Sequence, residues 1–224
     1  MYKFTLYITY IIYIIYMCWN ERVSLNTFLF SLFGVNFAYF NNVINSYEYL
    51  FCYSFISMQL LEYFTWKYFN NKKINRLLSQ LGLFLIFMQP LLFILIPDNL
   101  DASIKASLIA CYLLFWFCFG MFINVDFSMV KAPNGHLAWN WLNVPPPYIF
   151  TWLLFLLVVL LFIKKYILFT IHVIVFLAIY YTYFKTNTWG SLWCWISNII
   201  AGFLILRTFS NSNALNYFVI NNKV

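Results

Sequence analysis

The sequence predicts an all-α fold, a polytopic integral membrane helix bundle with seven transmembrane helices plus a marginal N-terminal hydrophobic helix. The first observation is composition: the 224 residues are 64% hydrophobic and only 8% charged, whereas soluble domains carry about 25% charged residues. The second is length, because most apolar runs approach the roughly 20 residues that a helix needs to cross a bilayer. The third is spacing, because short polar segments separate these runs.

The N-terminal apolar run, Tyr2–Tyr16, is shorter than a full span and follows a single Lys3. No small-x-small cleavage site comes after it, so we interpret it as an uncleaved helix rather than a signal peptide. Alternatively, Met17 is the true start and the preceding residues are an optional extension. The chain accordingly divides into the N-terminal helix or extension at 1–16, a single transmembrane bundle domain at 17–207 and a polar tail at 208–224.

Seven spans follow the N-terminal run. Ser24 is a candidate N-cap for the first of them. Pro90 lies in the second half of the third span, where it removes a backbone donor and is expected to kink the helix. The spans are expected at residues 25–40, 47–69, 77–96, 102–123, 149–163, 166–184 and 189–206.

The segment at 70–76 is the most basic loop and, together with Lys67, it carries four cations and no acid. The positive-inside rule therefore predicts that this loop is cytoplasmic. Counting helices from there puts the Lys164–Lys165 turn and the tail on the other side. The two lysines of that turn favour the opposite orientation, but we give more weight to the loop with four cations.

The longest segment between spans, residues 124–148, allows two interpretations. Loops of this length are often functional or partly embedded in the protein. Paired tryptophans such as Trp139 and Trp141 are also typical of a segment anchored at the membrane interface. We favour the interfacial interpretation, because paired interfacial tryptophans are common.

Gln59 and Glu62 form the most informative polar pair in the sequence. They lie three residues apart in the second span, so a helix presents them on one face. An ionisable group inside a membrane span suggests a functional site, here a polar pocket. The alternative is an interfacial acid, because Lys67 ends the span only five residues further on. The residues alone weigh these two interpretations about equally.

The remaining polar residues of the spans carry weaker signals. Gln89 and Asn198 are expected to hydrogen-bond between helices. A metal site could be assembled in space from Cys18, Cys194 and the weak candidate ligands Glu62, His136 and His172. Their spacing does not support one, so no metal and no cofactor is expected. The five cysteines lack a C-x-x-C motif and are expected to be free thiols.

Three short pieces carry a resemblance: Met17-Cys18-Trp19-Asn20 leading to Ser24, Gln59-x-x-Glu62-x-x-x-Trp66, and Trp193-Cys194. They resemble an uncharacterised multi-helix membrane family of bacteria and large DNA viruses, with a Met-Cys-aromatic-Ser start and a His-Gln-x-x-Glu-x-x-x-Trp motif. The match covers about residues 17–206. Asn20 and Met58 stand where that family has Ser and His. The resemblance implies a shared site containing Cys18, Gln59, Glu62, Trp66 and Cys194, and no activity.

The function predicted first is that of a multi-pass membrane protein of the channel or transporter type, with a polar pocket around Glu62 for a small solute or ion. Glu62, Gln59, Trp66, Cys18, Cys194, Asn198 and His172 are the pocket candidates. A membrane-embedded enzyme, metal-dependent or not, is the first alternative, although no catalytic signature supports it. A structural or interaction protein of a cellular or viral membrane is the second.

The expected partner is the lipid bilayer of a host or viral membrane, with a homo-oligomer left open. The net charge of +7 is scattered over loops and helix ends, so no nucleic-acid partner is expected. Aromatic residues make up 24% of the chain, and AT-rich codons account for this content more simply than an aromatic ligand box.

Overall fold

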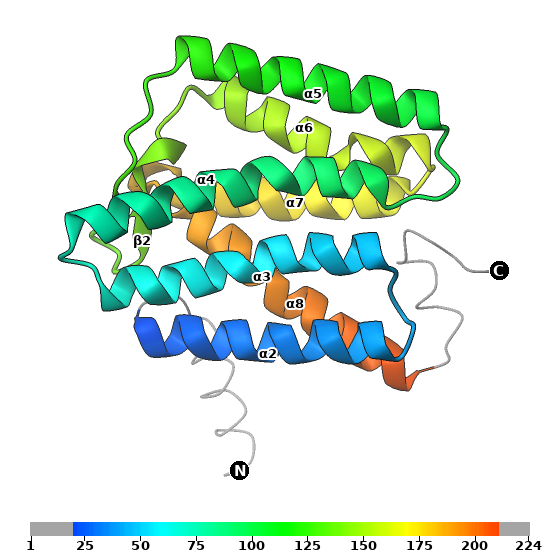
Figure 1. Cartoon of the computed structure of the whole chain (residues 1–224), viewed down its shortest axis with the longest axis horizontal. Coiled ribbons are helices and arrows are strands. Elements are labelled where there is room, and N and C mark those ends of the chain that lie inside the picture. Colours follow the sequence, from blue (N-terminus) through cyan, green and yellow to red (C-terminus); the bar gives the residue numbers. More distant parts are fainter. Residues whose placement is uncertain (1–19, 211–224) are drawn as a thin grey trace.

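The computed structural model describes residues 20–210, apart from the side chains of Cys194 and Trp195, and these residues form an all-α bundle (Figure 1). The N-terminal run and the tail beyond Ser210 lie outside the described residues. The helix bounds differ from the predicted spans by at most five residues. The described helices are α2 (Glu21–Phe40), α3 (Ser46–Lys67), α4 (Lys72–Leu95), α5 (Ala102–Phe122), α6 (Pro146–Phe162), α7 (Tyr166–Tyr183) and α8 (Trp189–Phe209).

Five of the described helices are long and apolar enough to cross a membrane, namely α2, α4, α5, α8 and α7 with its extension to Thr186. Helices α3 and α6 are not among these five. Helix α3 is less apolar, since it carries the acidic residues Glu48 and Glu62. Helix α6 has only 17 residues, which corresponds to about 26 Å.

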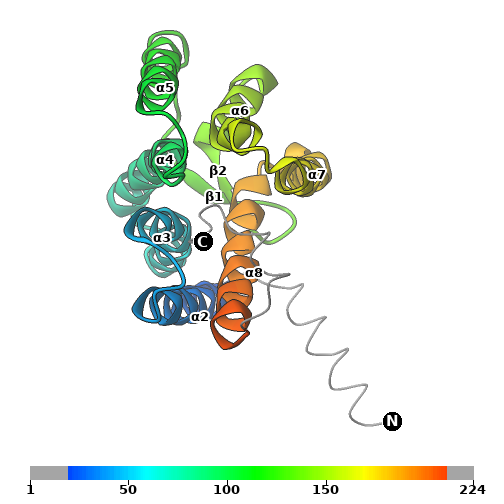
Figure 2. The same ribbon diagram turned by 90° about the vertical axis from the view of Figure 1, so that its right-hand side faces the viewer.

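The helix axes lie roughly parallel or antiparallel to one another, except that α8 crosses the bundle obliquely (Figure 1). Seen end-on, α2, α3, α4 and α5 follow one another along one side, and α8 packs against α2, α3 and α7 (Figure 2). Helix α5 is the outermost, because only Tyr112 and Phe119 among its 21 residues are buried. The bundle has two ends. We call the end that contains residues 68–71, 123–145 and 184–188 the hairpin end, because residues 123–145 include a two-stranded β-hairpin. The opposite end, with residues 41–45, 96–101 and 163–165, is the turn end.

The first described helix is capped by Asn20, whose side-chain oxygen accepts a hydrogen bond from the Val23 backbone N–H at 3.0 Å. The prediction that Ser24 caps this helix is therefore wrong. Ser24 lies one turn further on, and its side chain is fully buried. Both residue types are good N-caps, so composition did not discriminate between them.

Residues 123–145 fold back into the hairpin end of the bundle instead of lying on its surface. They include the antiparallel strands β1 (Met129–Lys131) and β2 (Leu137–Trp139) and the short helix η1 (Asn140–Leu142). Trp139 and Trp141 are 0% and 3% exposed, so the prediction of interfacial tryptophan anchors is wrong. Gly82 of α4 leaves the space for the Trp139 ring, because a Cβ at that position would overlap it.

Hydrogen bonds hold this hairpin against α3 and α4. The Asn75 side chain donates to the Met129 carbonyl at 2.9 Å and accepts from the Met129 N–H at 2.8 Å. The Thr65 hydroxyl lies 3.5 Å from the Met129 sulfur. The hairpin is therefore part of the buried core and closes one end of the bundle.

Pro90 lies inside α4, where neighbouring helices supply hydrogen bonds to the carbonyls around it. The Ile86 carbonyl, four residues earlier, has no Pro90 N–H to accept from. The Trp152 indole of α6 donates to it at 3.1 Å. The Tyr112 hydroxyl of α5 donates to the adjacent Phe87 carbonyl at 2.9 Å. The hydrogen bonds to the carbonyls around Pro90 therefore link α4 to both α5 and α6.

Candidate polar site and two interior cavities

Gln59 and Glu62 both point into the bundle and are 0% exposed. Their face of α3 also carries Phe55, whose ring centroid lies 6.2 Å from that of Trp193 on α8. The interpretation of Glu62 as an interfacial acid is therefore wrong. Its side chain is enclosed by protein, although Lys67 ends the helix nearby.

Small polar side chains surround this level of the bundle. We call Ser24, Thr27 and Ser31 of α2, Gln59 and Glu62 of α3, and Ser197 and Asn198 of α8 the three-helix seam. Every member except Asn198 is at most 3% exposed. The Ser31 hydroxyl lies 3.1 Å from Asn198 Oδ1 and 3.4 Å from the Ser197 hydroxyl.

The register of the three helices places the seam residues at similar heights. Helices α2 and α8 run in the same direction, because Ser31 meets Ser197 and Gly34 packs against Ala201. Helix α3 runs in the opposite direction, because Tyr49 donates to Asn36 at 2.9 Å. Following this register toward the hairpin end brings Ser24 and Thr27 level with Gln59 and Glu62.

Helix α4 contributes two further polar side chains to the interior. Ser79 and Gln89 are both 0% exposed, and neither side chain makes a hydrogen bond within the described part of the chain. Ser79 is one turn beyond Asn75, which bonds Met129 as described above. The predicted hydrogen bond of Gln89 to a neighbouring helix is therefore absent among residues 20–210.

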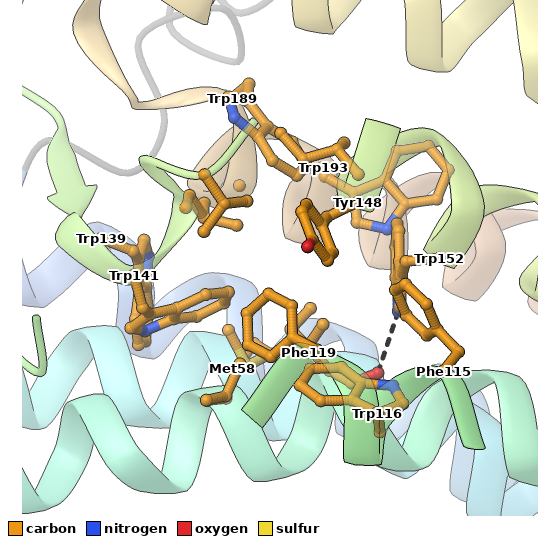
Figure 3. A pocket seen from close by; sticks show the side chains of 16 residues that line it. Met58, Phe115, Trp116, Phe119, Trp139, Trp141, Tyr148, Trp152, Trp189 and Trp193 are labelled. Carbon is orange, nitrogen blue, oxygen red and sulfur yellow. Dashed lines mark hydrogen bonds between the residues drawn. The ribbon is translucent and has the colours of Figure 1, made fainter. Parts of the chain in front are cut away.

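An aromatic cavity lies between α4, α5, α6, α8 and the hairpin (Figure 3). Its volume is about 50 Å³, and its walls are almost entirely apolar. Figure 3 shows Trp139 and Trp141 on one side of it, Trp116 and Phe119 on another, and Trp189, Trp193 and Trp152 closing the rest. Such a volume accepts at most a very small apolar molecule.

A second cavity of about 440 Å³ lies between α3, α4, α6, α7 and α8, toward the turn end. Its walls are mostly aliphatic, with Glu48, His172 and Arg207 as the polar exceptions. Trp193 lines both cavities. Neither Gln59 nor Glu62 lines either of them, although Met58 beside Gln59 lines the aromatic one.

The other predicted pocket residues occupy different places. The Trp66 indole N–H is buried without a hydrogen-bond partner in the described chain. His172 lines the second cavity, and its Nδ1 lies 2.7 Å from the Leu168 carbonyl. Cys194 belongs to α8, but its side chain is among those not described. Cys18 lies outside the described residues.

The weak metal candidates do not converge. His136 is buried in the hairpin, with its ring 6.1 Å from that of Tyr183, and burial lowers the pKa of its imidazole. Tyr183 and His172 are separated by about 16 Å along α7, at 1.5 Å per residue. Within residues 20–210, no three metal-ligating side chains come together.

Several residues that organise this site carried no local signal in the sequence. The Trp139 indole donates to the Ser191 hydroxyl at 3.2 Å, and that hydroxyl donates to the Leu137 carbonyl at 3.0 Å. Asn134 donates to Thr188 at 2.9 Å. Each of these contacts joins residues more than fifty positions apart, so only the packed helices bring them together.

The chain was also compared with known proteins. No family model, no curated protein and no solved structure matches it.

Proposed function

We propose that this chain is a multi-pass membrane protein that binds or conducts a small polar solute or cation at the Gln59–Glu62 face of the three-helix seam. The Glu62 carboxylate is the charged group of the proposed site. The Gln59 amide, one helical turn away, supplies a donor and an acceptor.

The observation that carries the proposal is the complete burial of Glu62 in an apolar bundle. Removing a carboxylate from water costs several kcal/mol unless hydrogen bonds or an opposite charge offset the loss. Even a partnered buried carboxylate is often no better for stability than an apolar side chain of similar volume, so a chain that served only as a packed scaffold gains little from one. A site that exchanges a proton or holds a cation requires such a group.

The state of the interior supports binding rather than a purely structural role. A dry and fully packed bundle would favour a structural protein. The two cavities, of about 50 Å³ and about 440 Å³, show that this interior is not fully packed, although neither cavity is lined by Gln59 or Glu62. The enzyme alternative gains no support from the described residues.

The proposal is tested by ion flux into vesicles. The full chain is reconstituted into liposomes loaded with a pH-sensitive dye; a proton gradient is applied directly, and Na⁺ and K⁺ gradients are applied with a protonophore present, so that cation movement appears as proton counterflow. The wild type is expected to dissipate one of these gradients faster than protein-free vesicles. Glu62→Gln is expected to abolish the flux, and Gln59→Leu is expected to reduce it.

The matched control is Glu21→Gln, which removes an exposed acid at the same end of the bundle and is expected to keep the wild-type flux. Thermal unfolding in detergent separates loss of function from loss of fold. Glu62→Gln is expected to keep a cooperative unfolding transition, because the amide preserves the volume and the hydrogen-bonding capacity of the side chain. A Glu62→Gln protein that conducts like the wild type contradicts the proposal.

The kind of membrane that holds the protein and its family are part of the same proposal. We place it in a cellular or viral membrane, and we relate it to the bacterial and viral family through Gln59, Glu62 and Trp66. Metal analysis of the purified protein tests the enzyme alternative in its metal-dependent form, since bound zinc or iron would favour it.

A further inference from the structure

The cavity of about 440 Å³ has its polar groups at one end only. Glu48 is in the first turn of α3, His172 in the second turn of α7 and Arg207 in the last turns of α8. These three positions lie at the turn end. The wall toward the middle of the bundle consists of apolar side chains such as Val175 and Ile196, and it ends at Trp193.

The cavity opens sideways between α7 and α8. Ile171 of α7 and Ile199 of α8 line it, yet they are 43% and 56% exposed on the outside of the bundle. A molecule in the cavity therefore remains continuous with whatever covers this outer surface. In a membrane-spanning bundle, that surrounding medium is the acyl region of one leaflet.

The dimensions fit one acyl chain. Arg207 and Trp193 are about 21 Å apart along α8, at 1.5 Å per residue. One leaflet contributes about 15 Å of hydrocarbon, half of the roughly 30 Å core. The volume of about 440 Å³ lies within the range of small-molecule sites, roughly 300–1,000 Å³. The space is too long and too apolar for a small polar solute.

The polar end favours an anionic headgroup. Arg207 uses one of its five N–H donors on the Val43 carbonyl at 3.0 Å, and a guanidinium with remaining donors suits a phosphate. The Lys164–Lys165 turn lies directly between α6 and α7 at the same end. The Glu48 carboxylate accepts from the Asn45 N–H at 2.8 Å at its own helix start, and its charge also acts on Arg207, so a phosphate at Arg207 would share that guanidinium with Glu48.

We infer that this cavity is a binding site for an anionic phospholipid of the surrounding bilayer, with one acyl chain between α7 and α8 and the phosphate at Arg207. The inference does not depend on the function proposed for Glu62. Glu62→Gln is expected to retain the lipid, so the two proposals can fail separately.

Native mass spectrometry of the full chain tests the inference. The protein is equilibrated in mixed micelles with equal amounts of phosphatidylglycerol and phosphatidylcholine, and the detergent is then removed from the ions. One phosphatidylglycerol is expected to remain bound to the wild type. Arg207→Gln is expected to reduce the preference for phosphatidylglycerol about tenfold, which corresponds to about 1.4 kcal/mol. Lys105→Gln, another turn-end cation that lies outside the cavity, is expected to behave like the wild type.

Filling the cavity tests the acyl chain separately. Val175→Trp places an indole in the cavity and is expected to abolish retention of both lipids. Ile174→Trp, the adjacent residue on the same helix, is 61% exposed and is expected to change nothing. If Val175→Trp fails to fold, Ile200→Phe fills the same space from α8. Undiminished retention in the filled variants, an unchanged preference in Arg207→Gln, or retention of a free fatty acid in place of the phospholipid overturns the inference.

Discussion

Trp152 supplies the hydrogen bond that Pro90 withholds from its own helix. The indole of Trp152 donates to the Ile86 carbonyl at 3.1 Å, four residues before the proline (Figure 3). A proline inside an apolar helix is tolerated when a neighbouring helix satisfies the carbonyl it leaves open. The two residues, on α6 and α4, therefore stabilise the fold as a pair.

This pairing predicts a specific coupling between two substitutions. Trp152→Phe leaves the Ile86 carbonyl buried without a donor and is expected to cost about 1–3 kcal/mol beyond the loss of packing. With Pro90→Ala also present, the backbone N–H restored at position 90 bonds that carbonyl, and the cost of Trp152→Phe is expected to shrink. Denaturant unfolding in micelles measures the four corners of this cycle.

Trp141→Phe is the matched control, because its indole N–H makes no hydrogen bond within the described chain and it lines the same cavity. Its cost is expected to be the same with and without Pro90. Equal costs of Trp152→Phe in the two backgrounds would show that the proline and the indole act independently.

Gly82→Ala is expected to destabilise the bundle by about 1–3 kcal/mol, because the new methyl group overlaps the buried Trp139 ring. Gly120→Ala on α5 is the comparison, since no atom lies within 4 Å of its would-be Cβ. That variant is expected to gain up to about 1 kcal/mol from helix propensity. Thermal unfolding of both proteins checks the opposite signs, and a neutral Gly82→Ala would contradict the close packing of Trp139.

Asn75→Ala is expected to release the hairpin from α4, because it removes both hydrogen bonds to Met129. Each buried backbone group left without a partner costs about 1–3 kcal/mol. Hydrogen exchange of residues 129–139 is expected to accelerate, while that of α2 stays unchanged. Gln80→Ala, an exposed position on the same helix, controls for the loss of side-chain volume.

The hairpin is expected to weaken in acid through His136. Burial lowers the pKa of this imidazole below its ordinary value of 6.5, so the folded hairpin contains the neutral ring. Between pH 6.5 and the lower pKa of the folded state, the unfolded chain binds more protons at His136 than the folded chain does, and stability falls as the pH falls. Hydrogen exchange of the hairpin between about pH 7.5 and pH 5.5 is expected to show this loss, at most about 1.4 kcal/mol per pH unit.

His136→Gln cannot titrate and is expected to flatten that part of the profile. A variant that keeps the wild-type slope assigns the pH dependence to another group.

The two ends of the bundle differ in charge, which predicts the orientation. Among residues 20–210, with the adjoining helix turns included and the buried Glu62 left out, the hairpin end carries seven cations and two acids, net +5, and the turn end carries four cations and three acids, net +1. The positive-inside rule then places the hairpin end in the cytoplasm. In a cysteine-free background, an impermeant maleimide added to intact cells is expected to label Lys164→Cys and spare Lys73→Cys. The reverse pattern inverts the assignment.

Apolar runs predicted the helices well, because a span is a local property of about 20 residues. The spacing of Gln59 and Glu62 likewise placed both on one face. The neighbours of that face could not be predicted, because the parallel contact of α2 with α8 joins Ser31 to Ser197 across most of the chain. Trp139 misled for another reason: buried and interfacial tryptophans share the same local composition, and only the space at Gly82 distinguishes them.

Trp193 lines both the aromatic cavity and the larger cavity. The two cavities therefore have this one lining side chain in common. The aromatic cavity borders α5 and α6, and the larger cavity opens between α7 and α8. A smaller side chain at position 193 is therefore expected to join the two cavities into one continuous interior space.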